Sequence, residues 1–398
     1  MKTKYSPHPV SSETQSLPQA RHEINSRDHS VVGRRSFLRK MGMAGASLVP
    51  ATALLMTQGK ALGKEFRRGL TQGDVDILRF VAAAEILETD LWQQYQELAD
   101  NNKAFAAALN VLDADMVQYT DDNTDDEDSH QKFLNAFLVS VGAQPVNLEG
   151  FRTLTGSKAT GAKNKLRLTN LMHLNVDTSW YTRYRSGENP DFGDAFKGPI
   201  TIVNRPGIPL NDKDTPANQL PPSTHMQAIA NTAGFHFPTI EQGGSSLYGS
   251  FIPKATSKVV LRILYAIGGS EVAHFQTWHD KAGNAPPLTD NTPGFPSVTF
   301  PDLNSPPFGG EAFQTNLIMP EPCRFISERL PLCSIIRPTR TKNAGAVAAA
   351  TFLTNMGLFT GQSKAFGDVL FGLAKAADKA RRQLERAEDE DGLKKENE

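Results

Sequence analysis

The sequence predicts an all-α protein built on a four-helix bundle, with an irregular insertion between the second and third helices and extra helices at the C-terminus. Four segments repeat their apolar residues with the period of an α-helix. The second and fourth segments each carry a glutamate three residues before a histidine. The first and third each carry a glutamate seven residues before an aromatic residue. We expect the helices at residues 74–100, 114–142, 223–251 and 254–282.

The composition of the 398-residue chain is that of a globular protein and excludes several classes. Hydrophobic residues make up 39% and charged residues 21%, which provides enough apolar side chain for a core. The net charge of -1 provides no overall field that attracts nucleic acid. No apolar run reaches the roughly 18 residues of a membrane-spanning helix, so no stable membrane span is expected. Two cysteines exclude a disulfide-dense scaffold and an all-cysteine zinc site.

Residues 1–61 are predicted to be a disordered N-terminus followed by an export signal. Arg34 and Arg35 precede Ser-Phe-Leu and a short stretch rich in alanine and glycine, which is the layout of a secretory signal. The pair resembles a twin-arginine (Tat) signal, which implies the Tat translocase as a partner and a periplasmic or extracellular location. Small residues allow cleavage after Ala53 or Ala61. The alternative is a basic surface patch followed by a proline-broken core helix.

Residues 70–145 are expected to hold the first helix pair. Thr71 and Asp74 have the spacing of a capping box at the start of the first helix. Glu85 lies on the apolar stripe of that helix, and the Glu-x-x-His motif of the second helix extends its stripe in the same way. Gly142 is expected just beyond the C-terminus of the second helix.

Residues 146–222 break the helical pattern and predict an irregular insertion. Two short helical stretches are expected near residues 165–185, and an extended run at residues 200–203 predicts one short hairpin. The second helix pair then occupies residues 223–282. Pro238 is expected to kink or restart the third helix, because proline lacks the backbone N–H that a helix interior uses.

Two further segments complete the chain. Residues 283–342 predict a Pro-rich loop with Cys323 and Cys333, for which a disulfide and two free buried thiols are open alternatives. Residues 343–398 predict two C-terminal helices and a charged tail. These helices would cover the bundle or form the contact of a homo-oligomer. We expect them at residues 344–359 and 363–386.

The chemistry of the chain is predicted at the two Glu-x-x-His motifs. Residues three apart lie on one face of a helix, so each motif points a carboxylate and an imidazole at one place. Bundles that hold two iron or manganese ions use one such motif from each of two helices and one glutamate from each of the others. Those glutamates are the ones seven residues before Trp92 and Tyr248. The six candidate ligands are Glu85, Glu127, His130, Glu241, Glu271 and His274.

Electrostatics favours a metal at this place. Four carboxylates facing one bundle interior would repel each other and lose hydration. Two divalent cations would balance their charge. Oxygen and imidazole ligands suit iron or manganese and do not select between them. The alternative is that each glutamate and histidine is a polar residue satisfied by its own neighbours.

Three stretches resemble the ferritin-like domain family, which includes Tat-exported bacterial members and plant desiccation-related proteins. Residues 70–92 are similar to its first helix, residues 127–134 to its second and residues 271–274 to its fourth. The resemblance covers about 70–145 and 225–282. It implies that Glu127 and Glu271 bridge two metals, that Glu85 and Glu241 are terminal ligands, and that His130 and His274 cap one metal each.

The assignments of Glu85 and Glu241 each meet a departure from the pattern of the family. Glu88 lies one turn from Glu85 and could replace it. Gly243 and Gly244 follow Glu241 and are poor helix formers, whereas the third helix of the family is smoother.

The resemblance implies redox chemistry with oxygen or peroxide as a small oxidant substrate. Ferrous oxidation, peroxide reduction and peroxide disproportionation are all open, with Glu127 and Glu271 as catalytic residues. The alternative function is a non-catalytic stress or desiccation-protection protein on the same bundle. An iron-storage shell is disfavoured because long insertions would obstruct the tight packing of a cage.

Overall fold

The computed structural model describes residues 70–183, 197–308, 320–321, 327–334 and 344–383. Arg34, Arg35 and Cys323 lie outside these residues, so the predicted export signal and disulfide are not tested. All the described residues belong to one compact unit. No helix within the described ranges combines the length and the apolar character that crossing a bilayer requires.

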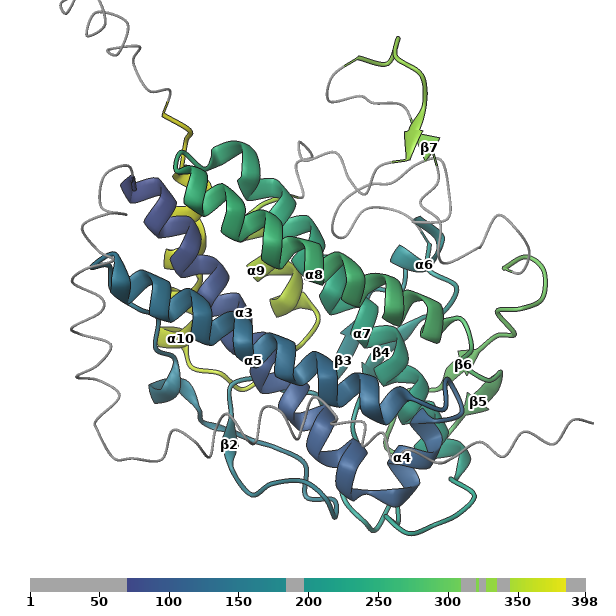
Figure 1. The fold of residues 1–398 in the computed structure, drawn as a ribbon. Coiled ribbons are helices and arrows are strands. Elements are labelled where there is room, and N and C mark those ends of the chain that lie inside the picture. The colour runs from purple at the N-terminus through teal and green to yellow at the C-terminus, as the bar shows by residue number, and fades with distance from the viewer. Residues whose placement is uncertain (1–69, 184–196, 309–319, 322–326, 335–343, 384–398) are drawn as a thin grey trace, which may run out of the picture. The chain divides into compact units, whose positions relative to one another are not determined.

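Four long helices form the bundle and confirm the predicted fold class (Figure 1). They pack as two pairs, α3 with α5 and α7 with α8. At the start of α3, the side chain of Thr71 accepts a hydrogen bond from the backbone N–H of Asp74, and the Asp74 carboxylate accepts one in return. Gly142 follows α5 with a φ of 76°, as expected for a residue that ends a helix. The bounds are Gln72–Asn101 for α3, Met116–Ser140 for α5, Thr224–Phe251 for α7 and Lys258–Ala282 for α8.

Helix α7 continues without a break through Pro238, so the expected restart does not occur there. Nearly every residue of α7 is buried, including Pro238 itself. Tertiary packing around the whole circumference of the helix outweighs the one backbone hydrogen bond that the proline removes. A one-turn 3-10 helix, Ile252–Lys254, connects α7 to α8.

The insertion is built from hairpins, and of the two helical stretches expected near residues 165–185 the described residues contain one, a single turn at Trp180–Arg183. The 3-10 helix Glu149–Phe151 opens it, and the single turn α6 is its α-helical part within the described residues. Leu174 and Val176 are buried on either side of exposed Asn175, which is the period of a strand rather than a helix. Two antiparallel hairpins replace the one expected. The elements are β1 (Leu154–Thr155) with β2 (Leu166–Arg167), β3 (Leu174–Val176) with β4 (Ile202–Arg205), and α6 (Trp180–Arg183).

Beyond the bundle, the described residues add two hairpins and two helices. The hairpins fall within the expected Pro-rich loop, and the two helices confirm the predicted C-terminal pair but are shorter. Helix α10 packs against α3 and α9. At the start of α3, a Cβ built on Gly73 would lie 3.1 Å from the Cβ of Ala380, which directly follows α10. The elements are β5 (Leu288–Asp290), β6 (Val298–Phe300), β7 (Pro320–Glu321), β8 (Cys333–Ser334), α9 (Ala346–Asn355) and α10 (Lys364–Lys379). The short helix α4 (Lys103–Leu109) lies between α3 and α5.

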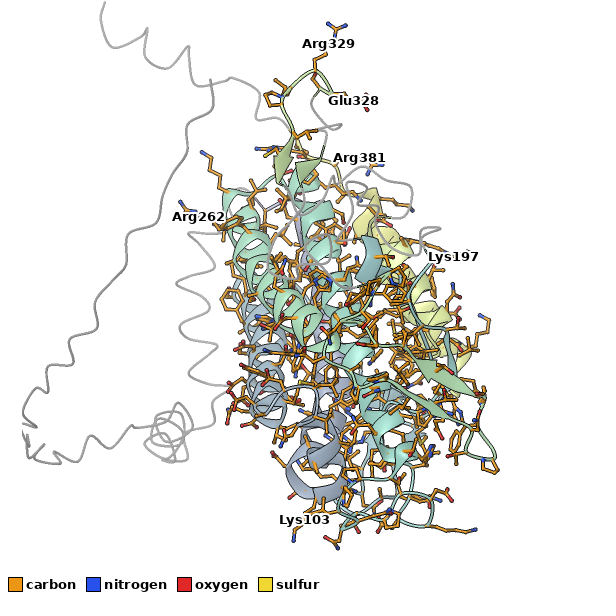
Figure 2. All side chains as sticks on the ribbon, turned by 90° about the vertical axis from the view of Figure 1, so that its right-hand side faces the viewer. Lys103, Lys197, Arg262, Glu328, Arg329 and Arg381 are labelled. Carbon is orange, nitrogen blue, oxygen red and sulfur yellow. The ribbon has the colours of Figure 1, made fainter. Side chains whose placement is uncertain are left out.

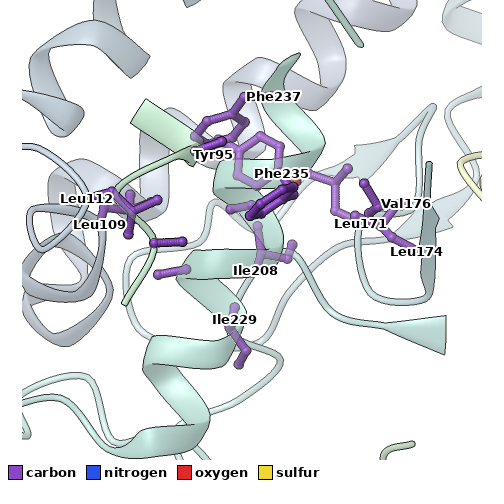
Figure 3. Packing of buried hydrophobic residues seen from close by; sticks show 14 of the residues in the cluster. Tyr95, Leu109, Leu112, Leu171, Leu174, Val176, Ile208, Ile229, Phe235 and Phe237 are labelled. Carbon is purple, nitrogen blue, oxygen red and sulfur yellow. The ribbon is translucent and has the colours of Figure 1, made fainter. Parts of the chain in front are cut away.

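The insertion contributes to the core rather than lying outside it. Leu171, Leu174 and Ile208 pack with Tyr95 of α3 and Phe235 of α7 in one cluster of buried side chains (Figure 3). Charged side chains such as those of Lys103 and Arg262 point away from the helices (Figure 2). The bundle and the insertion therefore form one packed unit around the four long helices.

Candidate metal centre

The four bundle helices bring all six predicted ligands together. Glu85 comes from α3 and Glu241 from α7, while the two Glu-x-x-His motifs come from α5 and α8. Each glutamate is at most 1% exposed, so none of the four carboxylates is a solvated surface charge. Burial of four carboxylates at one place requires compensating positive charge.

The six side chains form two groups that share two members. One group contains Glu85 and His130, the other contains Glu241 and His274, and both contain Glu127 and Glu271. Within each group the potential ligand atoms all lie within 4.8 Å of one another. Two overlapping groups with a shared pair of carboxylates are the arrangement of a carboxylate-bridged pair of metal ions.

The histidine nitrogens mark the two positions. His130 Nδ1 lies 3.2 Å from Glu127 Oε2, 3.3 Å from Glu85 Oε2 and 3.4 Å from Glu271 Oε1. His274 Nδ1 lies 3.1 Å from Glu127 Oε1 and 3.2 Å from Glu241 Oε2. In both cases the Nδ1 atom faces the carboxylates.

The donor set fits a pair of cations. Both carboxylate oxygens of Glu271 and the Oε2 atom of Glu85 are buried without a hydrogen-bond partner in the protein. Such orphaned oxygens are costly unless a cation or a proton satisfies them. Helix α7 leaves room for Glu271, because a Cβ on Gly244 would lie only 2.1 Å from its Oε2. Four carboxylates and two imidazoles are ligands for iron or manganese.

A second layer of polar side chains orients these ligands. The Asn123 side-chain amide donates to Glu127 Oε1 at 3.1 Å and to Glu241 Oε1 at 3.0 Å. The hydroxyl of Tyr248 donates to Glu85 Oε1. These contacts fix the rotamers of carboxylates from three helices.

The outward nitrogens of the two histidines have different partners. His130 Nε2 lies 3.1 Å from Ser270 Oγ, and His274 Nε2 lies 3.1 Å from Asp126 Oδ2. The sequence analysis missed Asn123, Asp126 and Ser270. Asn123 lies one helical turn before Glu127 on the same face, which is the one signal that could have indicated it.

Burial and repulsion shift the pKa values of the cluster. Burial, followed by repulsion from Glu241 and Glu85, raises the pKa of Glu127 to about 7. Burial also raises the pKa of Glu271 well above its usual value. At His130 burial lowers the pKa, but the Glu127 and Glu85 carboxylates outweigh it and raise the pKa to about 10. Without a cation, protons must therefore supply the charge compensation.

Glu88, the alternative to Glu85, belongs to neither group. It lines a cavity of about 20 Å³ together with Gly243, Gly244 and apolar side chains of α9. Burial, followed by repulsion from Glu85, raises its pKa well above the usual value. Glu85 is therefore the candidate ligand on α3, and Glu88 lies one turn away from the two groups.

The fold and the cluster together define a class: a four-helix bundle with buried glutamate and histidine clusters that suggest a dinuclear metal site. The sequence matches the family described as ferritin-like domain over residues 73–284, and this is more than half of the chain. The protein therefore belongs to the ferritin-like domain family. The match includes all six candidate ligands and ends before the C-terminal helices. Comparisons with curated proteins and with solved structures found no significant match.

Proposed function

We propose that the protein is an exported metalloprotein that holds two iron or two manganese ions and reacts with oxygen or peroxide. The observation that carries the proposal is the shared pair of carboxylates, Glu127 and Glu271, between two groups that each add one glutamate and one histidine. A bound pair of such ions would supply electrons to, or accept them from, a small oxidant.

The side chains of this chain have distinct parts in that proposal. Glu127 and Glu271 would hold both metal ions, because both groups contain them, and Glu85 and Glu241 would each hold one. Tyr248 holds Glu85 by its hydroxyl, and Asn123 holds Glu127 and Glu241 by its amide. The apolar side chains around the bundle interior exclude bulk water from the carboxylates.

Metal analysis tests the ligand set. The protein purified from the compartment where it accumulates should contain about two iron or manganese ions per chain. His130→Ala and His274→Ala should each reduce the occupancy. His173→Ala is the matched control, because His173 is exposed and bonds Asn204 away from the cluster. Equal metal contents in all four proteins would contradict the proposal.

Peroxide consumption tests the chemistry. The reduced, metal-loaded protein should consume peroxide faster than the same amount of free metal. Glu127→Ala and Glu271→Ala should abolish the difference, because each removes a bridge.

A protective, non-catalytic role is the second candidate, and one observation favours it. The raised pKa of His130 allows a protonated imidazole to compensate nearby carboxylates without metal. A wild-type protein whose melting temperature is indifferent to chelator would favour this role over the redox enzyme.

Export by the Tat route is the remaining proposal. Arg34 and Arg35 stand in a twin-arginine context, and Tat carries folded proteins. Replacing both with lysine should retain the protein in the cytoplasm. An unchanged extracytoplasmic pool after cell fractionation would exclude the route.

A further inference from the structure

A chain of aromatic side chains begins at the metal centre and runs into the core. Asn123, which donates to Glu127 and Glu241, accepts a hydrogen bond of 2.8 Å from the indole Nε1 of Trp278. Trp278 is thus separated from two proposed metal ligands by one side-chain amide. Its ring is 1% exposed and belongs to the same helix as Glu271 and His274.

The chain continues by direct ring contact. The rings of Trp278 and Trp92 stack with centroids 5.3 Å apart and an interplanar angle of 21°. The Trp92 ring lies 5.9 Å from that of Tyr95, and Phe237 packs against all three rings. Trp92 and Tyr95 are fully buried, and Figure 3 shows Tyr95 beside Phe237. Contact between oxidisable rings at these separations, in a buried core, favours electron transfer between them.

The chain ends at a tyrosine that has a proton acceptor in place. The Tyr95 hydroxyl lies 2.8 Å from His236 Nδ1, and His236 Nε2 lies 3.0 Å from Met356 Sδ. Burial raises the pKa of Tyr95 and lowers that of His236 to about 3, so both groups are neutral. The phenol therefore donates to Nδ1, and the protonated Nε2 faces the thioether.

The two halves of the bundle differ at this point. Tyr248 and Trp92 each stand seven residues after a terminal glutamate, Glu241 and Glu85 respectively. Tyr248 donates directly to the opposite glutamate, Glu85. Trp92 makes no such contact, because its indole Nε1 is buried without a hydrogen-bond partner. Its role is therefore not that of a ligand-orienting donor.

We propose that Trp278, Trp92 and Tyr95 form a relay that carries single oxidising equivalents from the metal centre to the Tyr95–His236 pair. An electron leaves the Tyr95 ring and passes through Trp92 and Trp278 to the oxidised centre. The phenolic proton moves to His236 Nδ1, which leaves a neutral tyrosyl radical and an imidazolium. A tyrosine that has lost an electron is a far stronger acid than the phenol, so even this histidine accepts its proton.

The electrons balance as follows. One hydrogen peroxide takes two electrons and two solvent protons, its O–O bond breaks, and two waters form. Two successive passages along the relay supply the two electrons. After each passage a thiol gives one electron to the tyrosyl radical and releases its proton to solvent, while His236 returns the phenolic proton. The two thiyl radicals formed in two passages pair as a disulfide. The relay depends on the proposed function in one respect: the metal centre is the oxidant that withdraws the electrons.

Flash photolysis tests the relay without metal. The Trp180→Phe background leaves Trp92 and Trp278 as the tryptophans of the three-tryptophan chain. After an ultraviolet flash that ionises tryptophan, the indolyl radical absorption should decay while the phenoxyl absorption rises, at a rate independent of protein concentration. Tyr95→Phe should lose the rise. Tyr119→Phe is the matched control, because Tyr119 also contacts Trp278, with centroids 6.3 Å apart, but is not part of the proposed relay. An unchanged rise in Tyr95→Phe would overturn the relay.

Peroxide treatment of the metal-loaded protein separates the two proposals. Wild type should give a tyrosyl electron paramagnetic resonance signal, and Tyr95→Phe should lose it while oxidation products mapped by mass spectrometry move to Trp92 and Trp278. Trp92→Phe, which interrupts the relay in its middle, should lose the signal as well. Peroxide consumption without any Tyr95 radical would overturn the relay. No consumption in wild type would refute the proposed function, while the flash experiment would still decide the relay.

Discussion

Glu271 is a carboxylate in a position that disfavours its charged form. Both of its oxygens are buried without a hydrogen-bond partner, and burial raises its pKa well above the usual value. Gly244 on α7 makes the arrangement possible, since a Cβ there would meet Glu271 Oε2. A glycine inside a helix costs about 1 kcal/mol relative to alanine. From sequence, Gly243 and Gly244 count against Glu241 as a ligand; in the structure Gly244 makes room for another one.

Gly244→Ala is therefore expected to displace Glu271 and to lower metal occupancy. The added methyl group should also destabilise the bundle by about 1–3 kcal/mol, as overpacking of a core does. Gly269→Ala is the matched control on α8, because a Cβ at Gly269 meets nothing within 4 Å. Metal analysis and thermal melting check both variants. Full occupancy in Gly244→Ala would contradict the assigned place of Glu271.

Residue types and spacing were sufficient to find the six candidate ligands but not the side chains that orient them. Each Glu-x-x-His motif can be recognised from sequence, because its two residues are three apart in one helical segment. Asp126 and Ser270 act across helices, on His274 and His130. Contacts of that kind depend on which helix faces which, and one sequence does not contain that information.

At the scale of elements, the long helices were predictable and the insertion was not. A 25-residue helix such as α5 shows many turns of its apolar period. Strands of two to four residues are too short for their alternation to be recognised from sequence, and distant partners decide where they form. Arg205 of β4, for example, is buried against Asp290 of β5. Its place is fixed by a hairpin far along the chain.

The buried pair between Arg167 of β2 and Glu97 of α3 joins the insertion to the bundle. Burial lowers the pKa of Arg167 and raises that of Glu97, so desolvation outweighs their attraction. Arg167→Met should leave Glu97 buried and unpaired, and should cost about 3–5 kcal/mol of unfolding free energy. Adding Glu97→Met should recover most of that loss. Urea unfolding of the single and double variants checks this, and an additive loss would contradict it.

At the scale of the whole molecule, a chain of almost no net charge buries four carboxylates at one place in its interior. The net charge of -1 gives no hint of four carboxylates buried at one place. The fold class followed from the repeat of two helix pairs, and the family match over residues 73–284 agrees with it. Which of the buried side chains carry protons could not be predicted from the sequence, because it depends on the distances between side chains on different helices.

The pH dependence of stability should reverse when metal is removed. The folded protein raises the pKa of Glu127 from 4.5 to about 7 and that of His130 from 6.5 to about 10. Both groups stabilise the fold when protonated. In chelated protein their contribution is complete below pH 4.5 and 6.5 respectively, and is lost as the pH rises toward 7 and 10. For Glu127 the loss is about 3 kcal/mol at most.

Metal-loaded protein should behave oppositely at acidic pH, because its ligands must be deprotonated and acid therefore releases the ions. Melting temperatures between pH 5 and pH 9, with and without chelator, check the reversal. Glu127→Gln is the control, since it should flatten the chelated curve up to about pH 7. Parallel curves with and without chelator would contradict a metal-dependent bundle.

The contact between Gly73 and Ala380 constrains when the chain can finish folding during its synthesis. The start of α3 packs closely against the segment that follows α10. Contacts between distant parts of a chain form late and slow folding, because the loop between them must first be closed. A nascent chain in which α10 has not yet been made has every ligand helix but lacks this last contact. The domain is therefore expected to complete its fold only when α10 is available to pack against the helix that was made first.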